Sequence, residues 1–150
     1  MSSSSTRYLK GTLTADNARK DLVIDDGRLT HGFIIKSFTL WPARAGQVGD
    51  FSCVLATKSS GAFTPMNASD NRQVGWGYGV FRLPNGGATG IETIILPDEI
   101  ILEELILVAD WAAPYYEEGI NYLIELCPIT ISDSQSALVL INNKSQDLQD

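Results

Sequence analysis

The apolar residues of this chain occur in runs of strand length. Between Tyr8 and Ile131 almost every run is bounded by Gly, Pro, Asn or Asp, and the one good helix signal follows only afterwards. Short apolar runs separated by turn residues predict β-strands. This order predicts an all-β fold, an antiparallel β-sandwich closed by one short C-terminal α-helix.

Eight strands are predicted from the alternation of apolar and polar residues. They are Arg7–Leu13, Asp21–Ile24, Phe33–Trp41, Phe51–Thr57, Gln73–Leu83, Ile91–Leu96, Ile100–Val108 and Ile120–Cys127. The run from Ile100 to Trp111 has some helix formers, but its β-branched and apolar density favours a strand. A count of eight or nine strands indicates a jelly-roll-like sandwich, since a jelly roll has eight.

Simple alternation predicts which side chains share a face. On Phe33–Trp41 it places Phe38 and Leu40 on the face opposite to Phe33. On Gln73–Leu83, glycine occupies every second position, at 75, 77 and 79, while aromatic residues lie between. Because repeated glycine weakens a strand, another backbone or side chain is expected to approach the bare face closely. Contact between the two sheets is favoured over a ligand platform.

A chain of 150 residues with 44% hydrophobic composition fits one domain with an ordinary core. Residues 1 to 20 are interpreted as an extended N-terminal arm, with a crossing to a neighbouring subunit as one hypothesis. Residues 21 to 150 form the sandwich domain. Ser132 and Gln135 fit a capping box, which predicts a helix at about 133–146. Cys53 and Cys127 are expected to be small core residues.

The net charge of -7 is unevenly distributed along the chain. Residues 91 to 150 contain twelve Asp or Glu and one Lys or Arg. The acidic part is either a solvated face or a patch that meets the more basic N-terminal half of a neighbouring subunit. No nucleic acid partner is expected, because no basic cluster is present. No membrane partner is expected either, because no apolar run is long enough to span a bilayer.

Motifs for catalysis or metal binding are missing from the sequence. His31 is the single histidine, which excludes a multi-histidine metal centre. No serine occurs in a Gly-x-Ser-x-Gly turn. Paired carboxylates such as Asp98/Glu99 and Glu117/Glu118 fall in turns, where solvated acids are common. We therefore expect no enzyme activity, no cofactor and no metal; a hydrolase that uses two carboxylates across a cleft stays open as a lesser hypothesis.

Aromatic residues are the remaining candidates for a binding site. Rings able to stack on sugars are Trp41, Trp76, Trp111, Tyr115 and Tyr116, and Tyr78 lies on the glycine-rich strand beside Trp76. The last three of these five rings are predicted to lie in a loop, where binding residues concentrate. Trp111, Tyr115, Tyr116, Trp76 and Tyr78 are therefore candidate contacts for a protein interface or a surface glycan. Aromatic enrichment alone does not separate the two, and a buried edge or subunit contact is favoured.

Four segments carry a resemblance to a known family. GRLTHGFIIKSFTLWP (Gly27 to Pro42), NASDNRQVGWG (Asn67 to Gly77), ILPDEIILEELIL (Ile95 to Leu107) and NYLIELCPITISDSQSALVLINNKSQD (Asn121 to Asp147) are similar to small virion structural proteins of marine tailed bacteriophages. The resemblance implies a non-enzymatic β-sandwich that is synthesised in the host cytoplasm and decorates the capsid surface. Its expected partners are the major capsid protein and its own copies, as a homo-oligomer with three subunits. A carbohydrate-binding module is the alternative.

Overall fold

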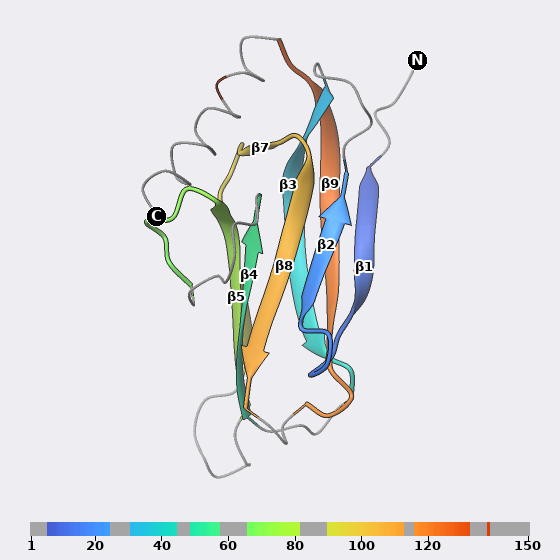
Figure 1. The fold of residues 1–150 in the computed structure, drawn as a ribbon, viewed down its shortest axis with the longest axis vertical. Coiled ribbons are helices and arrows are strands. Elements are labelled where there is room, and N and C mark those ends of the chain that lie inside the picture. The colour runs from blue at the N-terminus through green and yellow to red at the C-terminus, as the bar shows by residue number, and fades with distance from the viewer. Residues whose placement is uncertain are drawn as a thin grey trace.

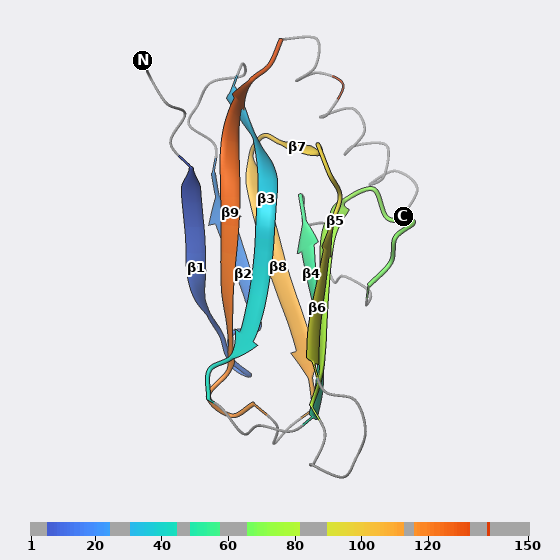
Figure 2. The ribbon, with the colours of Figure 1, turned by 180° about the vertical axis from the view of Figure 1, so that it is seen from behind.

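The computed structural model describes residues 6–24, 31–44, 49–57, 66–81, 90–112 and 116–132, together with Leu138. Within these ranges the chain forms nine strands: β1 (Arg7–Leu13), β2 (Arg19–Val23), β3 (His31–Pro42), β4 (Gly49–Ala56), β5 (Gln73–Phe81), β6 (Gly90–Ile95), β7 (Ile100–Ile101), β8 (Glu104–Trp111) and β9 (Ile120–Thr130). They form two antiparallel sheets that lie face to face (Figures 1 and 2). The prediction of an all-β sandwich is confirmed.

The order of the strands is that of a jelly roll. One sheet has the order β1-β9-β3-β7 and the other the order β2-β8-β4-β5-β6. The pairs are nested, because β5 pairs with β4, β7 with β3, β8 with β2 and β9 with β1. Nesting of this kind results when one long antiparallel hairpin is rolled into two sheets. β6 adds a further strand at the edge of the five-stranded sheet.

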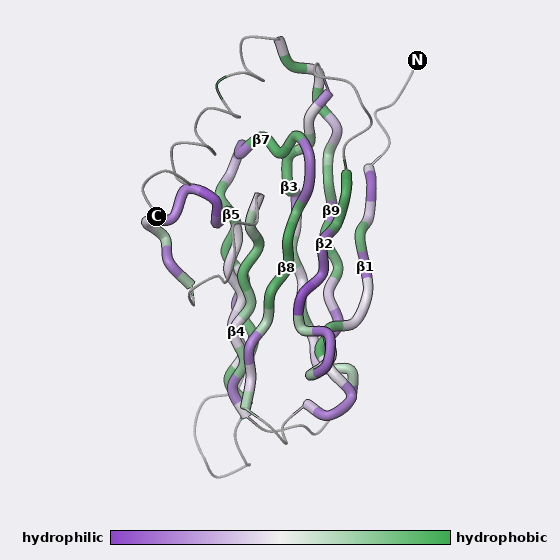
Figure 3. The backbone as a smooth tube through the Cα atoms, viewed as in Figure 1, coloured by the Kyte–Doolittle hydropathy of each residue, from purple (hydrophilic) through white to green (hydrophobic). Residues whose placement is uncertain are grey.

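The core lies between the sheets and takes alternate residues from each strand. β8 contributes Leu105 and Leu107, and β9 contributes Ile124 and Leu126, all with 0% exposure. Figure 3 shows the resulting hydrophobic stretches along β8 and β4. Because every second residue of a strand points to the same face, the remaining residues point outward. Each sheet therefore presents an outer face whose residues follow from the register.

A β-bulge in β3 corrects the predicted faces of that strand. Ile35 pairs with Leu126, but the next partner of β9, Glu125, pairs with Ser37, so Lys36 is an extra residue. An extra residue reverses the alternation beyond it. Phe38 and Leu40 therefore enter the core together with Phe33 and Ile35, instead of lying on the opposite face.

The bare face of β5 points into the core, as predicted for sheet-on-sheet contact. A Cβ atom at Gly77 would clash with the side chain of Leu40 and lie 3.4 Å from that of Phe38, both on the opposite sheet. A Cβ atom at Gly79 would clash with the ring of Phe51 on the neighbouring strand β4. The glycines thus make room for large side chains, and the hypothesis of a ligand platform on this face is not needed.

The run from Ile100 to Trp111 is extended, as expected, but it is divided between the sheets. β7 pairs with β3 in the four-stranded sheet, and β8 pairs with β2 and β4 in the other. Leu102 and Glu103 connect the two strands. The predicted single strand is therefore two strands that belong to different layers.

Both chain ends differ from the prediction or lie beyond the described ranges. Arg7–Leu13 pairs along its whole length with β9 of the same chain, and Arg19–Val23 pairs with β8. Residues 7 to 20, which belong to the segment interpreted as an extended arm, thus supply the edge strand β1 of one sheet and the start of the edge strand β2 of the other. Of the predicted helix at 133–146 the structure describes Leu138 alone, which is helical. No helix in the described part could cross a membrane.

Candidate functional site

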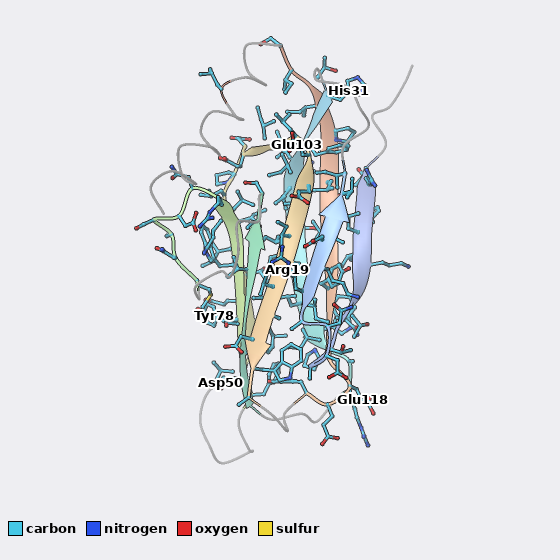
Figure 4. All side chains as sticks on the ribbon, viewed as in Figure 1. Arg19, His31, Asp50, Tyr78, Glu103 and Glu118 are labelled. Carbon is cyan, nitrogen blue, oxygen red and sulfur yellow. The ribbon has the colours of Figure 1, made fainter. Side chains whose placement is uncertain are left out.

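A first hollow, here the acidic groove, lies on the outer face of the five-stranded sheet. It has a volume of about 630 Å³ and is lined among others by Asp50, Ser52, Tyr78, Asp110 and Trp111. Ser52 of β4 is opposite both Tyr78 of β5 and Asp110 of β8. Figure 4 shows Asp50 and Tyr78 at the same end of this sheet. The groove thus brings together two of the five predicted contact residues, Tyr78 and Trp111.

The hydroxyl of Tyr78 on β5 is hydrogen-bonded to an acidic side chain on the neighbouring strand β6. Its hydroxyl donates a hydrogen bond to Glu92 Oε2 on β6, where Glu92 is its direct neighbour in register. This hydrogen bond, together with the negative charge of Glu92, raises the pKa of Tyr78 above its usual value. The phenol therefore stays protonated and remains a donor to the carboxylate.

Trp76 lies on the same outer face but is held by hydrogen bonds. Its indole Nε1 donates to Gln73 Oε1 at 2.8 Å, and the same oxygen accepts the backbone N–H of Asn67 at 2.8 Å. Gln73 is buried, and its Nε2 has no hydrogen-bond partner among the described residues. Trp76 is half-buried and serves to fix the turn that precedes β5, so only part of its ring is accessible.

Tyr116, one of the three candidate rings of the predicted loop, is buried. Its side chain has 0% exposure, and its ring meets that of Phe51 edge-on at 5.4 Å between centroids. Its hydroxyl donates to the backbone oxygen of Gly49 at 2.6 Å. Trp111 is half-buried, with its centroid 6.4 Å from that of Tyr116, and Tyr115 lies outside the described residues. A platform that includes Tyr116 is therefore ruled out, because this ring belongs to the core.

A second hollow, here the aromatic groove, lies on the outer face of the four-stranded sheet. It has a volume of about 700 Å³ and crosses β1, β9 and β3, which lie side by side in Figure 2. The outward residues that line it are Tyr8, Lys10, Thr12, Trp41, Asn121 and Leu123. Trp41 is 42% exposed and Tyr8 is 57% exposed. These are the two most accessible aromatic side chains of the described chain.

This groove is not among the sites predicted from the sequence. Trp41 is one of five candidate rings there, and Tyr8 has no predicted role. A signal existed in the pattern itself. Tyr8, Lys10 and Thr12 are alternate residues of one predicted strand, and their bulk and polarity contrast with Leu9, Gly11 and Leu13 between them. An aromatic residue on the polar side of an amphipathic strand is expected to be exposed.

The histidine, cysteine and acidic residues form no metal-binding cluster in the part of the chain that the structure describes. No group of three or more His, Cys, Asp or Glu could hold a metal ion within it. His31 begins β3, at the end of the sandwich opposite to Asp50 (Figure 4). Glu118 makes an exposed ion pair with Arg44 at 3.5 Å.

The two cysteines differ, although both were predicted to be core residues. Cys53 is 1% exposed on the inner face of β4, and burial raises the pKa of its thiol. Cys127 is half-buried on β9 and lies opposite Ile34, outside the core. The prediction for Cys127 is therefore wrong. The two thiols are not joined in a disulfide.

One pair of carboxylates faces a common hollow. Asp50 and Asp110 lie on the neighbouring strands β4 and β8 and line the acidic groove. Both side chains are exposed. A glycosidase acid is usually activated by an apolar environment, which an exposed carboxyl lacks. The pair is arranged to attract cations or basic groups more readily than to deliver a proton.

Comparisons with models of protein families, with curated proteins and with solved structures found no match to this chain.

Proposed function

We propose that this protein is a non-enzymatic virion structural protein that decorates the capsid surface, where it binds the major capsid protein and its own copies. The observation that carries the proposal is the nested pairing of β1 with β9, β2 with β8, β3 with β7 and β4 with β5. This is the jelly-roll arrangement, on which many viral capsid domains and lectins are built.

The segments that resemble phage virion proteins lie on the framework of the sandwich. They include all of β3 and β7, all of β9 except Ile120, the first five residues of β5 and the first half of β8. These strands supply many of the core residues. The resemblance thus supports a shared fold, and because one fold serves many functions, the functional argument has to come from the surfaces.

The outer faces of the two sheets carry opposite balances of charge. The face of the five-stranded sheet presents Asp21, Asp50, Glu92, Glu104 and Asp110 against Arg19 alone. The face of the four-stranded sheet presents Lys10 and Lys36 against Glu125. Complementary potentials fix the orientation of a partner. A protein that binds both a shell and its own copies needs two such distinct surfaces, and this charge division supplies them.

The decisive experiment mixes the purified protein with phage heads that lack it. We expect saturable binding at a fixed number of copies per head and a mass in solution corresponding to three subunits by light scattering. A variant with Asp50→Asn and Asp110→Asn should bind heads more weakly, because it removes two charges from the acidic groove. Glu118→Gln, which changes an acid outside this face, is the matched control. Failure of the unmodified protein to bind heads would contradict the proposal.

Carbohydrate binding is the second candidate function. Burial of Tyr116 removes one of the three rings on which that candidate was based. Exposed Tyr8 and Trp41 provide two other rings on a different surface, and their shared groove is the observation that favours this candidate.

A further inference from the structure

The aromatic groove has the size of a ligand site. A single exposed apolar side chain is ordinary on a protein surface. It is less ordinary for two exposed aromatic side chains to line one hollow, here of about 700 Å³. Exposed apolar groups that lie together often mark a binding site. Sites for small ligands have volumes of roughly 300–1,000 Å³ and combine aromatic walls with a few polar groups. The groove meets both criteria.

The register of the strands fixes the spacing between the two rings. Tyr8 lies opposite Glu125 of β9, whereas Trp41 lies opposite Asn121, four residues along the same strand. Tyr8 and Trp41 lie on the strands that flank β9. Their Cα atoms are therefore displaced by about 13 Å along the strands and about 10 Å across them. One small molecule cannot stack on both rings, but a linear ligand of several rings can.

Hydrogen-bonding groups lie between the rings. Thr12 Oγ1 donates to Asn121 Oδ1 at 2.6 Å, which fixes the amide and leaves the two hydrogens of its nitrogen for an acceptor. Among the described residues, no acceptor forms a hydrogen bond with Asn121 Nδ2. Covering this amide with an apolar partner would leave its donors unpaired, at a cost in binding free energy. A sugar avoids this cost, because its hydroxyls accept hydrogen bonds while its C–H faces stack on rings.

The charge of the groove distinguishes between classes of sugar. Among the described residues that line it, Lys10 is the only charged one, and it lies on β1 between Tyr8 and Thr12. Most of the acids of this chain, whose net charge is -7, lie elsewhere, and five of them are on the opposite outer face. An anionic ligand therefore meets the least repulsion at this groove and gains a partner in Lys10.

The surroundings of the groove fit an oligosaccharide better than a folded protein. A stable protein interface buries about 800 Å² on each partner and has an apolar centre. The outward neighbours of Leu123 in the sheet are Lys10 and Thr39, and those of Glu125 are Tyr8 and Ser37. The apolar groups are therefore separated by polar ones, as along a sugar chain, rather than gathered into one patch.

We propose that the aromatic groove binds an acidic oligosaccharide longer than a disaccharide, with Trp41 and Tyr8 stacked on two of its rings. Asn121 donates to its hydroxyls, and Lys10 pairs with a carboxylate or sulfate between the two stacked rings. The inference is independent of any role in a virion, because it concerns a surface that the chain presents by itself.

The test is titration calorimetry of the full chain with two probes of equal ring number, a hexamer of 1,4-linked galacturonic acid and neutral cellohexaose. We expect the acidic hexamer to bind more tightly and its affinity to fall as salt is added. Trp41→Ala and Tyr8→Ala should each raise the Kd at least about tenfold, as truncation of an anchoring ring does. Lys10→Gln should weaken the acidic hexamer and leave any binding of cellohexaose unchanged. Tyr78→Ala, which removes a ring from the opposite face, should have no effect.

Three results would overturn the proposal. One is the absence of binding to either hexamer by a protein whose circular dichroism shows it to be folded. A second is equal binding of both hexamers with no effect of Lys10→Gln, which would refute the acidic ligand. The third is a change in the solution mass of Trp41→Ala without any change in sugar binding, which would assign the groove to contact with a second copy of the chain.

Discussion

The hydroxyl of Tyr116 donates a hydrogen bond to the backbone oxygen of Gly49, 67 residues away, at 2.6 Å. The bond joins the turn before β9 to the first residue of β4, and so it connects the two sheets at one end of the sandwich. Tyr116 also has a positive φ of 53°, which a non-glycine residue adopts only at some cost. Burial of its ring against Phe51, Phe81 and Trp111 holds it in this conformation.

Tyr116→Phe should lower the free energy of unfolding by about 1–3 kcal/mol, because it keeps the ring but leaves a buried carbonyl without this donor. Tyr116→Ala should lower it further, by about 3–5 kcal/mol, because it also opens a cavity. Urea denaturation monitored by tryptophan fluorescence measures both changes in the free energy of unfolding. Tyr8→Phe, at an exposed tyrosine, is the matched control and should change stability little. Equal stability of Tyr116→Phe and the unmodified protein would refute the role of this bond.

The close approach of the sheets at Gly77 predicts a coupled pair of substitutions. Gly77→Ala should destabilise the protein by about 1–3 kcal/mol, because the added methyl group clashes with Leu40. The gain of about 0.5–1 kcal/mol from removing a flexible glycine is smaller than this cost. In a Leu40→Ala background the clash disappears, so Gly77→Ala should then be neutral or stabilising. A double-mutant cycle measures the coupling, and additive effects would show that the sheets are not in contact here.

The different burial of the two cysteines predicts different reactivity. Burial raises the pKa of the Cys53 thiol, so the reactive thiolate is scarce in the folded state, and the side chain is also inaccessible. Iodoacetamide should modify only Cys127 at pH 8, and it should modify both residues in urea. Intact mass spectrometry with Cys53→Ser as the reference identifies the site. Modification of Cys53 at the rate of Cys127 without denaturant would contradict the packing.

The buried ion pair of Asp70 and Arg72 predicts a dependence of stability on pH. Arg72 Nη2 lies 2.7 Å from Asp70 Oδ2, and both side chains are buried. Hydrogen bonds from Arg72 lower the pKa of Asp70 below its usual value of 3.8. A lowered folded-state pKa contributes stability that is present above the unfolded-state value and is lost as the pH falls through the folded-state value.

Asp70→Asn should therefore cost about 3–5 kcal/mol at pH 7, because it removes the carboxylate that pairs with the buried charge of Arg72. The difference between the variant and the unmodified protein should persist down to the ordinary pKa of aspartate and shrink below it. Asp21→Asn breaks the exposed pair with Arg19, and it is the control, with an expected cost under about 1 kcal/mol. Thermal melts between pH 2 and pH 7 measure both. A difference that does not change with pH would mean that the charge of Asp70 is unimportant.

The fold class could be predicted from the sequence because local signals agree along the chain. Turn residues bound most of the strands, and their alternation identifies the buried side chains of β4 and the bare face of β5. Pairing between strands that are distant in the sequence is not encoded so locally. The reversal of alternation at Lys36 depends on pairing with β9, more than 80 residues further along, as the Ser37–Glu125 hydrogen bond at a separation of 88 residues shows.

The candidate site was predicted less well, for a related physical reason. Whether an aromatic ring is exposed depends on what packs over it. Tyr116 follows a proline in a polar segment, yet Phe51 and Phe81 from distant strands enclose it. Tyr8 lies within a strand, yet its outward position leaves it 57% exposed. Position in a loop or strand was therefore a poor guide to accessibility, and the side of the strand was the better one.

The nested pairing of the strands also determines how this chain must acquire its structure. Thr12 and Asn121, which meet across β1 and β9, are 109 residues apart, so the four-stranded sheet closes only through a contact of very long range. Such topologies fold slowly, because loop closure must be completed before distant strands stabilise one another. During synthesis β1 is exposed to the cell as an unpaired strand until β9 has left the ribosome. The face that carries Tyr8 and Trp41 therefore cannot be completed before β9 is present, and a chain interrupted before β9 would leave the edge of β1 unpaired and open to aggregation.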